Sequence, residues 1–206
     1  MSWGESQVWL QGDSNAKYYQ DLLEDARTKP ARDSKRKKII KPNEMPWELS
    51  PHGILKHMVN ESMNTRLETL DVYMQIIPPG SRSGRHRHLA EEALYILEGE
   101  GYDIHVDCDV EITDTYHWIP QKESKRFDWQ EGDVVYIPPN TIHQHFNASK
   151  DKPARLISAT NRIYKHSGLN DLEQLENAPE YTPNTQLDAK RVDEMIRKAI
   201  QVAARS

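Results

Sequence analysis

The chain has 206 residues, of which 36% are hydrophobic and 29% charged, and its formal net charge is −5. This length suits one domain with solvated ends, and the negative charge argues against nucleic acid as the main partner, because phosphate binding needs a cationic face. The chain has no run of about 18 apolar residues and no signal-peptide pattern at its start, which argues against a membrane partner and favours a cytoplasmic protein.

Residues 1–48 are expected to form a polar arm that contains one short helix. Between residues 15 and 27 the apolar side chains fall on one helical face, and Pro30 lies just beyond, where a helix stop signal would stand. The basic segment at residues 27–41 is interpreted as a solvated arm, with a clamp on an acidic neighbour or substrate as the alternative.

Residues 49–165 are expected to form the main domain, an all-β barrel. Short runs rich in β-branched and aromatic residues alternate with turns of Gly, Pro and Asn, and no helical pattern intervenes. Many short strands of this kind are typical of a β-sandwich or barrel. The clearest runs are residues 70–77, 93–97, 133–137 and 155–159.

Residues 166–206 are expected to form a C-terminal extension with an amphipathic helix. Beyond Asn184, apolar residues recur at three- and four-residue spacing, which places them on one helical face. The helix is expected to pack on the barrel or on a partner subunit. Such an extension, like the N-terminal arm, can be exchanged between subunits, so a homodimer or higher homo-oligomer is expected.

The most informative segment runs from Gly80 to Gly99. In a strand, alternate side chains share a face, so His86 and His88 would point the same way and could hold one divalent metal ion. Glu92 has the same parity and follows a three-residue spacer, which is long enough for a turn that returns its carboxylate to the same point. A His-x-His pair is weak evidence by itself, but the spaced Glu and the flanking glycines strengthen it.

A second segment, residues 132–147, offers further candidate ligands to complete the metal site. A strand runs into a Pro-Pro-Asn turn, and a new strand begins near Ile142. In that strand His143, His145 and Asn147 share parity and would face inward together. One of them can complete a site of three histidines, or of three histidines and a carboxylate, which suits Fe, Mn, Ni, Cu or Zn.

These two segments resemble the two signature motifs of the cupin superfamily, whose members fold as jelly-roll β-barrels. The first motif is matched at every defined position, from the leading to the trailing glycine. The second is matched except that Asn140 stands where the motif has Gly, a mild change because Asn tolerates left-handed backbone. The resemblance implies four metal ligands: His86, His88, Glu92 and His143.

The flanking sequence is similar to the region that enters the first barrel of gentisate 1,2-dioxygenase-type enzymes. The similar stretches are residues 42–47, 52–60 and 77–88. Those enzymes use non-haem Fe(II) and O₂ to open dihydroxylated aromatic rings. They are two-barrel chains with three-histidine sites, whereas this chain has room for one barrel and offers Glu92 as a fourth ligand.

A fourth ligand restricts the chemistry that the resemblance implies. If Glu92 binds the resting ion, two positions of an octahedral ion stay open, too few for both a chelating substrate and O₂. Ring cleavage through a chelate would then need Glu92 to leave, or O₂ to react without binding the metal. A released carboxylate could act as a base.

Further candidates for the site follow from strand parity. His145 and Asn147 could orient substrate or hydrogen-bond a metal ligand, with His145 as a catalytic candidate, or they could be core polar residues satisfied by the backbone. Gln75 is a candidate substrate-binding residue because its parity directs it inward. Arg155 and Arg162 have opposite parity, so at most one points inward, where it could bind a carboxylate; Arg162 is the candidate carried forward.

Three functions remain open on these residues. The favoured one is a non-haem Fe(II) dioxygenase that acts on a small chelating substrate such as a dihydroxybenzoate, with Glu92 and His145 as catalytic residues. The second is a lyase, isomerase or decarboxylase that uses Zn, Mn or Ni as a Lewis acid without redox chemistry. The third is a cupin that binds a small molecule without converting it, since fold does not determine function.

Overall fold

The computed structural model describes residue 12 and residues 15–169 and 172–204. The chain divides into two compact units, residues 1–36 and residues 37–206. The boundary therefore falls earlier than the predicted end of the arm at residue 48. Residues 42–44 form a short 3-10 turn that leads directly into the first strand of the second unit.

The described part of the first unit contains one helix, α1 (Tyr18–Lys35), whose side chains all remain at least partly exposed. The helix was expected to end near Arg27, before Pro30, and this prediction is wrong because Pro30 lies inside it. Ion pairs span the proline turn: Arg32 lies 2.6 Å from Asp25, and Lys29 lies 3.4 Å from Asp33. Such pairs support a helix that the missing proline N–H weakens.

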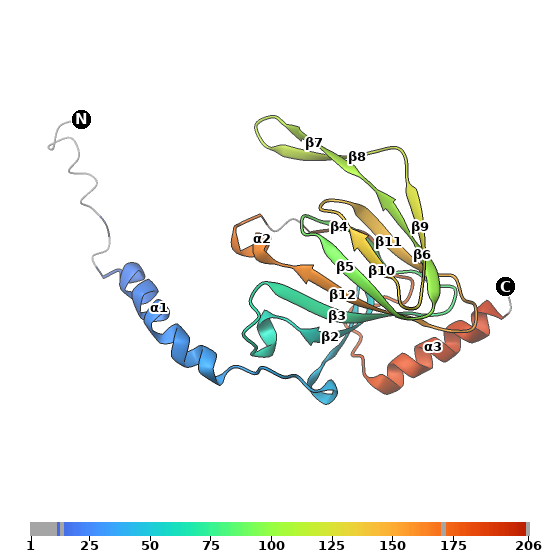
Figure 1. The fold of residues 1–206 in the computed structure, drawn as a ribbon, viewed down its shortest axis with the longest axis horizontal. Helices are drawn as coiled ribbons and strands as arrows, with labels where there is room; N and C mark the ends of the chain where they lie inside the picture. The colour runs from blue at the N-terminus through green and yellow to red at the C-terminus, as the bar shows by residue number, and fades with distance from the viewer. Residues whose placement is uncertain (1–11, 13–14, 170–171, 205–206) are drawn as a thin grey trace. The chain divides into compact units, whose positions relative to one another are not determined.

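The described part of the second unit forms two larger antiparallel sheets that face each other as a jelly roll (Figure 1), which confirms the predicted all-β barrel. One sheet consists, in spatial order, of β1 (Trp47–Ser50), β2 (Gly53–Val59), β3 (Leu70–Ile77), β12 (Ala154–Asn161), β5 (Glu92–Glu98) and β10 (Val134–Ile137). The other consists of β13 (Leu172–Glu176), β4 (Arg85–His88), β11 (Ile142–Asn147), β6 (Glu100–Val106) and β9 (Lys125–Gln130). Two further strands, β7 (Cys108–Ile112) and β8 (Tyr116–Pro120), pair in a separate hairpin.

Strand alternation divides the interior into an apolar part and a polar part. In β5, Leu94 and Ile96 are fully buried, while the alternate residues Ala93, Tyr95 and Leu97 face outward. They join an apolar cluster that closes one part of the barrel and includes Ile77, Trp129, Ile137, Ala154 and Leu156. The same alternation turns Glu92, at the start of β5, into the interior, where only 1% of it is exposed.

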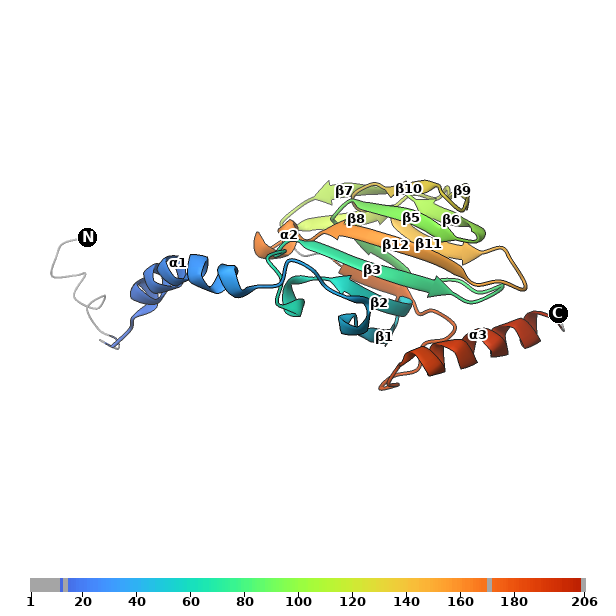
Figure 2. The same ribbon diagram turned by 60° about the horizontal axis from the view of Figure 1, so that its bottom comes forward.

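The C-terminal helix α3 (Ala189–Ala203) packs on the outer face of β1–β3, as Figure 2 shows. It begins at Asp188, whose side chain accepts a hydrogen bond of 2.8 Å from the Arg191 amide and so caps the helix. Its buried Val192 packs with Leu49 and Ile54. The helix thus packs on its own barrel, one of the two predicted partners. Within the described residues, no helix is long and apolar enough to cross a membrane.

The strand β13 was not expected, because its residues were assigned to the C-terminal extension. It pairs with the edge of β4, and Arg87 lies on the opposite face of β4 from the histidines. Strand alternation alone would leave Arg87 facing solvent. Instead it is 4% exposed and donates hydrogen bonds to Glu173 (3.0 Å) and Asn140 (3.1 Å). Its guanidinium carbon also lies 5.2 Å from the centre of the Trp118 ring, so side chains of other segments bury it on that face.

The glycine at position 101 permits the closest approach between β6 and its neighbours. A Cβ atom added to Gly101 would clash with the Phe146 carbonyl oxygen and with the Trp129 ring. We expect Gly101→Ala to destabilise the fold by about 3 kcal/mol, because backbone and a core aromatic ring must both shift. Gly132→Ala is the control. A Cβ atom at this position meets no atom within 4 Å, so the loss of stability comes from the φ of 90° alone. Equal losses in urea unfolding would contradict this account.

Candidate metal centre

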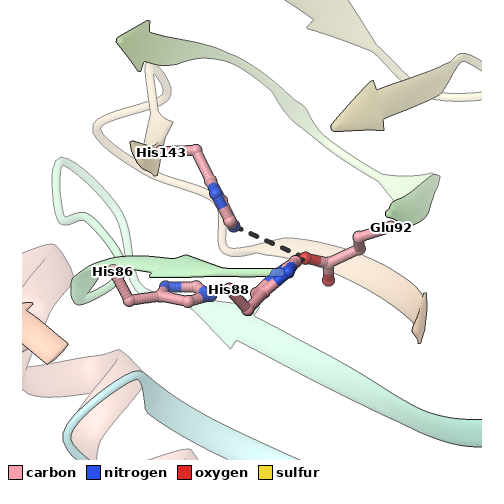
Figure 3. A group of neighbouring side chains, drawn as sticks. All are labelled: His86, His88, Glu92 and His143. Atoms are coloured by element: carbon pink, nitrogen blue, oxygen red, sulfur yellow. Dashed lines mark hydrogen bonds and ion pairs between the residues drawn. The ribbon is translucent and has the colours of Figure 1, made fainter. Parts of the chain in front are cut away.

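Four side chains converge at one point inside the barrel, as Figure 3 shows. His86 and His88 come from β4, Glu92 from the start of β5, and His143 from β11. Each offers a ligand atom, and these atoms all lie within 4.8 Å of one another. His86 and His143 stand opposite each other in the pairing of β4 with β11. These are the four residues predicted as metal ligands, and the structure brings all of them together.

Backbone carbonyls orient two of the imidazole rings. His88 Nδ1 lies 2.7 Å from the Ala90 carbonyl oxygen, and His143 Nδ1 lies 2.9 Å from the Thr141 carbonyl oxygen. A carbonyl can only accept, so each Nδ1 must carry the hydrogen and donate it. The Nε2 atoms of both rings are then unprotonated in the neutral tautomer, and they face the cluster.

The cluster fits a cation at its centre. The unprotonated Nε2 atoms of His88 and His143 lie 3.0 Å and 3.4 Å from the same carboxylate oxygen, Glu92 Oε2. Three lone pairs this close repel one another unless a proton or a metal ion lies between them. His86 Nδ1 and His143 Nε2 are also buried without a hydrogen-bond partner in the described chain. A divalent ion would satisfy these orphaned atoms, and three nitrogens with one oxygen suit a transition metal.

Glu92 is held on its other side as well. Its Oε1 accepts a hydrogen bond from the Ser158 hydroxyl and one of 3.4 Å from the Tyr73 hydroxyl. Burial opposes ionisation, but the close contacts with the imidazoles of His143 and His88 outweigh it and hold the pKa of Glu92 well below its usual range. Glu92 could leave the cluster only by breaking the bonds at Oε1, so the arrangement favours Glu92 as a ligand of the resting site.

Glu92→Gln tests whether this carboxylate binds the ion. We expect the variant to hold a divalent metal about tenfold more weakly or worse, because an amide carries no charge to offset that of the ion. The visible spectrum of the Co(II)-loaded protein should shift at the same time, since one ligand changes. Unchanged metal retention together with an unchanged spectrum would remove Glu92 from the ligand set.

His145 lies beside the cluster and faces a buried aspartate. Its Nδ1 is 2.9 Å from Asp103 Oδ1, which also accepts a hydrogen bond of 2.8 Å from the Trp129 indole. Burial disfavours both charges, but the pair stabilises them: the pKa of Asp103 lies below its ordinary value and the pKa of His145 lies above. The sequence interpretation missed Asp103, because its segment, residues 102–131, carries no motif. The catalytic role of His145 stays a prediction.

The buried ion pair predicts a pH-dependent stability. We expect Asp103→Asn to destabilise the fold by about 3 kcal/mol at neutral pH, because it leaves His145 buried without its counter-charge. Since folding depresses the pKa of Asp103, its contribution is present above about pH 4 and is lost as the pH falls below that value. Asp128→Asn, on an exposed pair with Arg126 in the same sheet, should cost at most about 1 kcal/mol. Similar losses for both variants in urea unfolding would contradict this account.

The structure separates the remaining site candidates. Gln75 faces inward, and its Nε2 donates a hydrogen bond of 2.9 Å to the His52 carbonyl oxygen. Arg162 is half-buried, lies 3.4 Å from Asp71 and lines a small cavity together with His88. Both positions are compatible with the predicted substrate contacts.

Asn147, in contrast, is held at both ends of its amide by backbone groups. Its Nδ2 donates to the carbonyl oxygens of Ile77 (3.0 Å), Pro78 (3.2 Å) and Lys152 (2.8 Å). Its Oδ1 accepts from the Ser149 amide at 3.0 Å. These contacts agree with the alternative role, a core residue that joins a turn to the end of β3, and the substrate-binding role of Asn147 stays a prediction.

A further histidine, His52, lies beside the cluster. The sequence interpretation did not assign it to the site. His52 occupies the tip of the β1–β2 hairpin, and its ring meets that of His86 edge-on at 4.2 Å between centroids. Burial, aided by the nearby His145, lowers the pKa of His52 to about 3, so the ring is uncharged. The Pro-His-Gly sequence of this turn indicates a hairpin tip but not the direction of the ring.

Comparison with known proteins decides the family. A model of the cupin domain matches residues 73–160, the span that holds all four cluster residues and most strands of both sheets. Residues 73–160 form a cupin domain. This match and the jelly-roll fold confirm the resemblance that the two motifs indicated.

Proteins similar in sequence differ in what their names describe. The chain is 29% identical over 99 residues to an uncharacterized protein of Methanocaldococcus jannaschii, which covers 48% of this chain and 65% of that protein. It is 25% identical over 121 residues to auxin-binding protein T85 of Nicotiana tabacum, which covers 58% of this chain and 61% of that protein. The matches thus span less than two thirds of either relative.

Solved structures share the fold alone. Vicilin from Solanum lycopersicum matches with a TM-score of 0.50 and 13% identity, over 67% of this chain and 36% of that chain. Enzymes are matched too, among them the salicylate 1,2-dioxygenase of Pseudaminobacter salicylatoxidans at a TM-score of 0.39 and 22% identity, over 57% of this chain and 29% of that chain. At these identities the reaction of this cupin must be argued from its own residues.

Proposed function

We propose that this cupin is a non-haem Fe(II) dioxygenase that acts on a small chelating substrate, such as a dihydroxylated aromatic compound. The observation that carries the proposal is the buried meeting of three imidazoles and one carboxylate at a single point. His86, His88, Glu92 and His143 would hold the ion. When bound, Fe(II) supplies the electrons that O₂ chemistry requires and a positive charge that attracts substrate oxygens.

The side chains around this point have separate tasks in the proposal. Glu92, anchored by Ser158 and Tyr73, fixes one side of the site and limits the positions open to substrate. Asp103 holds His145 by Nδ1, which leaves the Nε2 atom of that ring, unpartnered among the described residues, to hydrogen-bond a substrate oxygen. The apolar cluster around Leu94 excludes water from the neighbouring part of the barrel.

Two other functions have support of their own. A fourth protein ligand leaves fewer open positions, which favours a non-redox lyase, isomerase or decarboxylase that chelates substrate without O₂. Similarity to an auxin-binding protein favours a cupin that binds a small aromatic acid without turnover. The same four ligands would serve Zn or Mn in either case.

Metal analysis and O₂ uptake separate these three functions. Protein purified without added metal should contain iron, and O₂ should be consumed with at least one compound in a panel of dihydroxybenzoates and related chelators. Full turnover by a Zn-loaded, anaerobic preparation would support the non-redox function. Binding without conversion of any compound would support the third. The absence of O₂ uptake by fully iron-loaded protein would overturn the dioxygenase proposal.

A further inference from the structure

Two buried polar side chains beside the metal cluster keep atoms without a partner. Both ring nitrogens of His52 lack a hydrogen bond to any described residue, and so does Gln75 Oε1. His52 is 9% exposed and Gln75 is 0% exposed. Leaving such atoms unsatisfied is costly, so their free capacity points to a group that arrives with a ligand.

The geometry points to a recognition role, which rests on the proposed function. We propose that His52 and Gln75 together bind a hydroxyl group of the chelating substrate. They would thereby select compounds with a hydroxyl group at that position over compounds with a carboxylate there.

The backbone around His52 fixes its ring. The His52 carbonyl oxygen accepts hydrogen bonds from Gln75 Nε2 at 2.9 Å and from the Gly84 amide at 3.0 Å, and the His52 amide donates to Ser50 Oγ at 3.2 Å. The hairpin tip is thereby tied to both β3 and the start of β4. A Cβ on Gly84 would clash with the Pro51 carbonyl oxygen, so the two segments are in close contact. A ring held in this way is preorganised for binding.

The His52 ring lies against the metal cluster. Its centroid is 4.2 Å from that of His86, 5.8 Å from that of His145 and 6.1 Å from that of Tyr73. Tyr73 and Gln75 both point inward from β3, and the Tyr73 hydroxyl reaches Glu92. His52 and Gln75 therefore belong to the group of buried polar side chains that surrounds Glu92.

The free atoms define the chemistry of the group that they accept. Gln75 must point its Nε2 at the His52 carbonyl oxygen, so its free Oε1 is an acceptor. A buried imidazole without an acidic partner is uncharged and offers one donor and one acceptor. A hydroxyl can donate to Gln75 Oε1 and accept from the His52 N–H. A carboxylate can only accept and would face the amide oxygen unfavourably.

The charge of the interior leads to the same choice. Arg87 is the one buried arginine or lysine in the described chain, and it lies on the outer face of β4 with Glu173. Arg162, which is half-buried, is paired with Asp71, and His145 is paired with Asp103. Among the described residues, the interior therefore has no unpaired cationic side chain to offset a carboxylate, whereas a hydroxyl needs none.

Three probes that differ in one group test the inference on the Co(II)-loaded protein, where binding is read from the visible spectrum without turnover. Catechol, pyrogallol and 2,3-dihydroxybenzoate carry hydrogen, hydroxyl and carboxylate at the position next to the chelating pair. Wild-type protein should bind pyrogallol about tenfold more tightly than catechol, as two well-placed hydrogen bonds allow, and more tightly than 2,3-dihydroxybenzoate.

The variants His52→Phe and Gln75→Leu should each bring the ratio of pyrogallol affinity to catechol affinity close to one, while the Co(II) content stays unchanged. His52→Gln provides a second replacement if the phenylalanine disturbs folding. The control is His57→Phe, because His57 lies in the same hairpin, on β2, and pairs with Glu48 at 2.5 Å. The control should retain the full preference.

A preference that survives in all three site variants, or tighter binding of 2,3-dihydroxybenzoate by the wild type, would overturn the inference. An equal loss of catechol affinity or of Co(II) would also overturn it, because His52 would then only pack against His86. A hydroxyl preference that depends on His52, without O₂ uptake by the iron form, would reject the dioxygenase and leave the inference standing. O₂ uptake without the hydroxyl preference would reject the inference and leave the dioxygenase standing.

Discussion

His143→Ala is expected to weaken the binding of a divalent metal by more than about 100-fold, beyond the loss that follows when only a supporting residue is removed. His143 is completely buried, and its Nε2 is directed into the cluster because Nδ1 donates to the Thr141 carbonyl oxygen. Alanine removes the ligand nitrogen and leaves a gap lined by polar side chains, where a water molecule could replace it only as an untethered ligand. Competition with a chromophoric chelator and metal analysis after dialysis measure the loss.

The control for this substitution is another histidine of the same protein. His117 is exposed on β8, in the hairpin outside the two facing sheets, so His117→Ala should leave metal affinity unchanged. Circular dichroism must show that His143→Ala keeps its β-structure, so that lost metal binding does not reflect unfolding. Metal affinity within about threefold of the wild type in a folded His143→Ala protein would remove His143 from the site.

The metal cluster could be predicted from the sequence because it depends on local rules. Two residues of separation put His86 and His88 on one face of a strand, and the short spacer to Glu92 leaves little freedom for the chain between them. His143 follows a turn marked by two prolines and Asn140, whose φ is 61°, close to the left-handed value that the glycine of the motif would adopt. The chain therefore encodes each half of the cluster within a few residues.

The other residues around the cluster could not be predicted in this way. His52 contacts His86 from a hairpin tip, and Asp103 on β6 faces His145 on β11, so only the assembly of distant segments brings them to the site. Parity directs Asn147 inward correctly, yet it does not reveal that backbone groups occupy the whole amide. The sequence thus indicates which way a side chain points, whereas its partners depend on the assembled barrel.

The same distinction applies to the outside of the barrel. The residues of β13 are all exposed and mostly polar, so neither burial nor alternation predicts a strand there. The strand forms because β4 offers a free edge, and Arg87 gains Glu173 as a partner when β13 pairs with it. Pro30 in α1 is a second example. The helix continues past this local stop signal because ion pairs between neighbouring turns stabilise it.

Removal of the metal is expected to lower the free energy of unfolding by about 4 kcal/mol when the ion had been present at 1,000 times its dissociation constant. For a chain of this size that loss corresponds to a fall of about 8–16 °C in Tm. The physical reason is that the folded site gathers three buried imidazoles around one buried carboxylate, and without the ion their lone pairs face one another. Calorimetry of the metal-loaded protein, before and after treatment with a chelator, measures the difference.

Two controls connect this loss to the cluster. Returning the metal to the chelator-treated protein should restore Tm, and the chelator should not change the Tm of His143→Ala, whose site no longer retains the ion. A chelator effect of equal size in His143→Ala would mean that the stabilising ion binds elsewhere. An unchanged Tm in the wild type after complete metal removal would mean that the four side chains form a stable cluster of their own, held by shared protons, and that the barrel does not need the ion to fold.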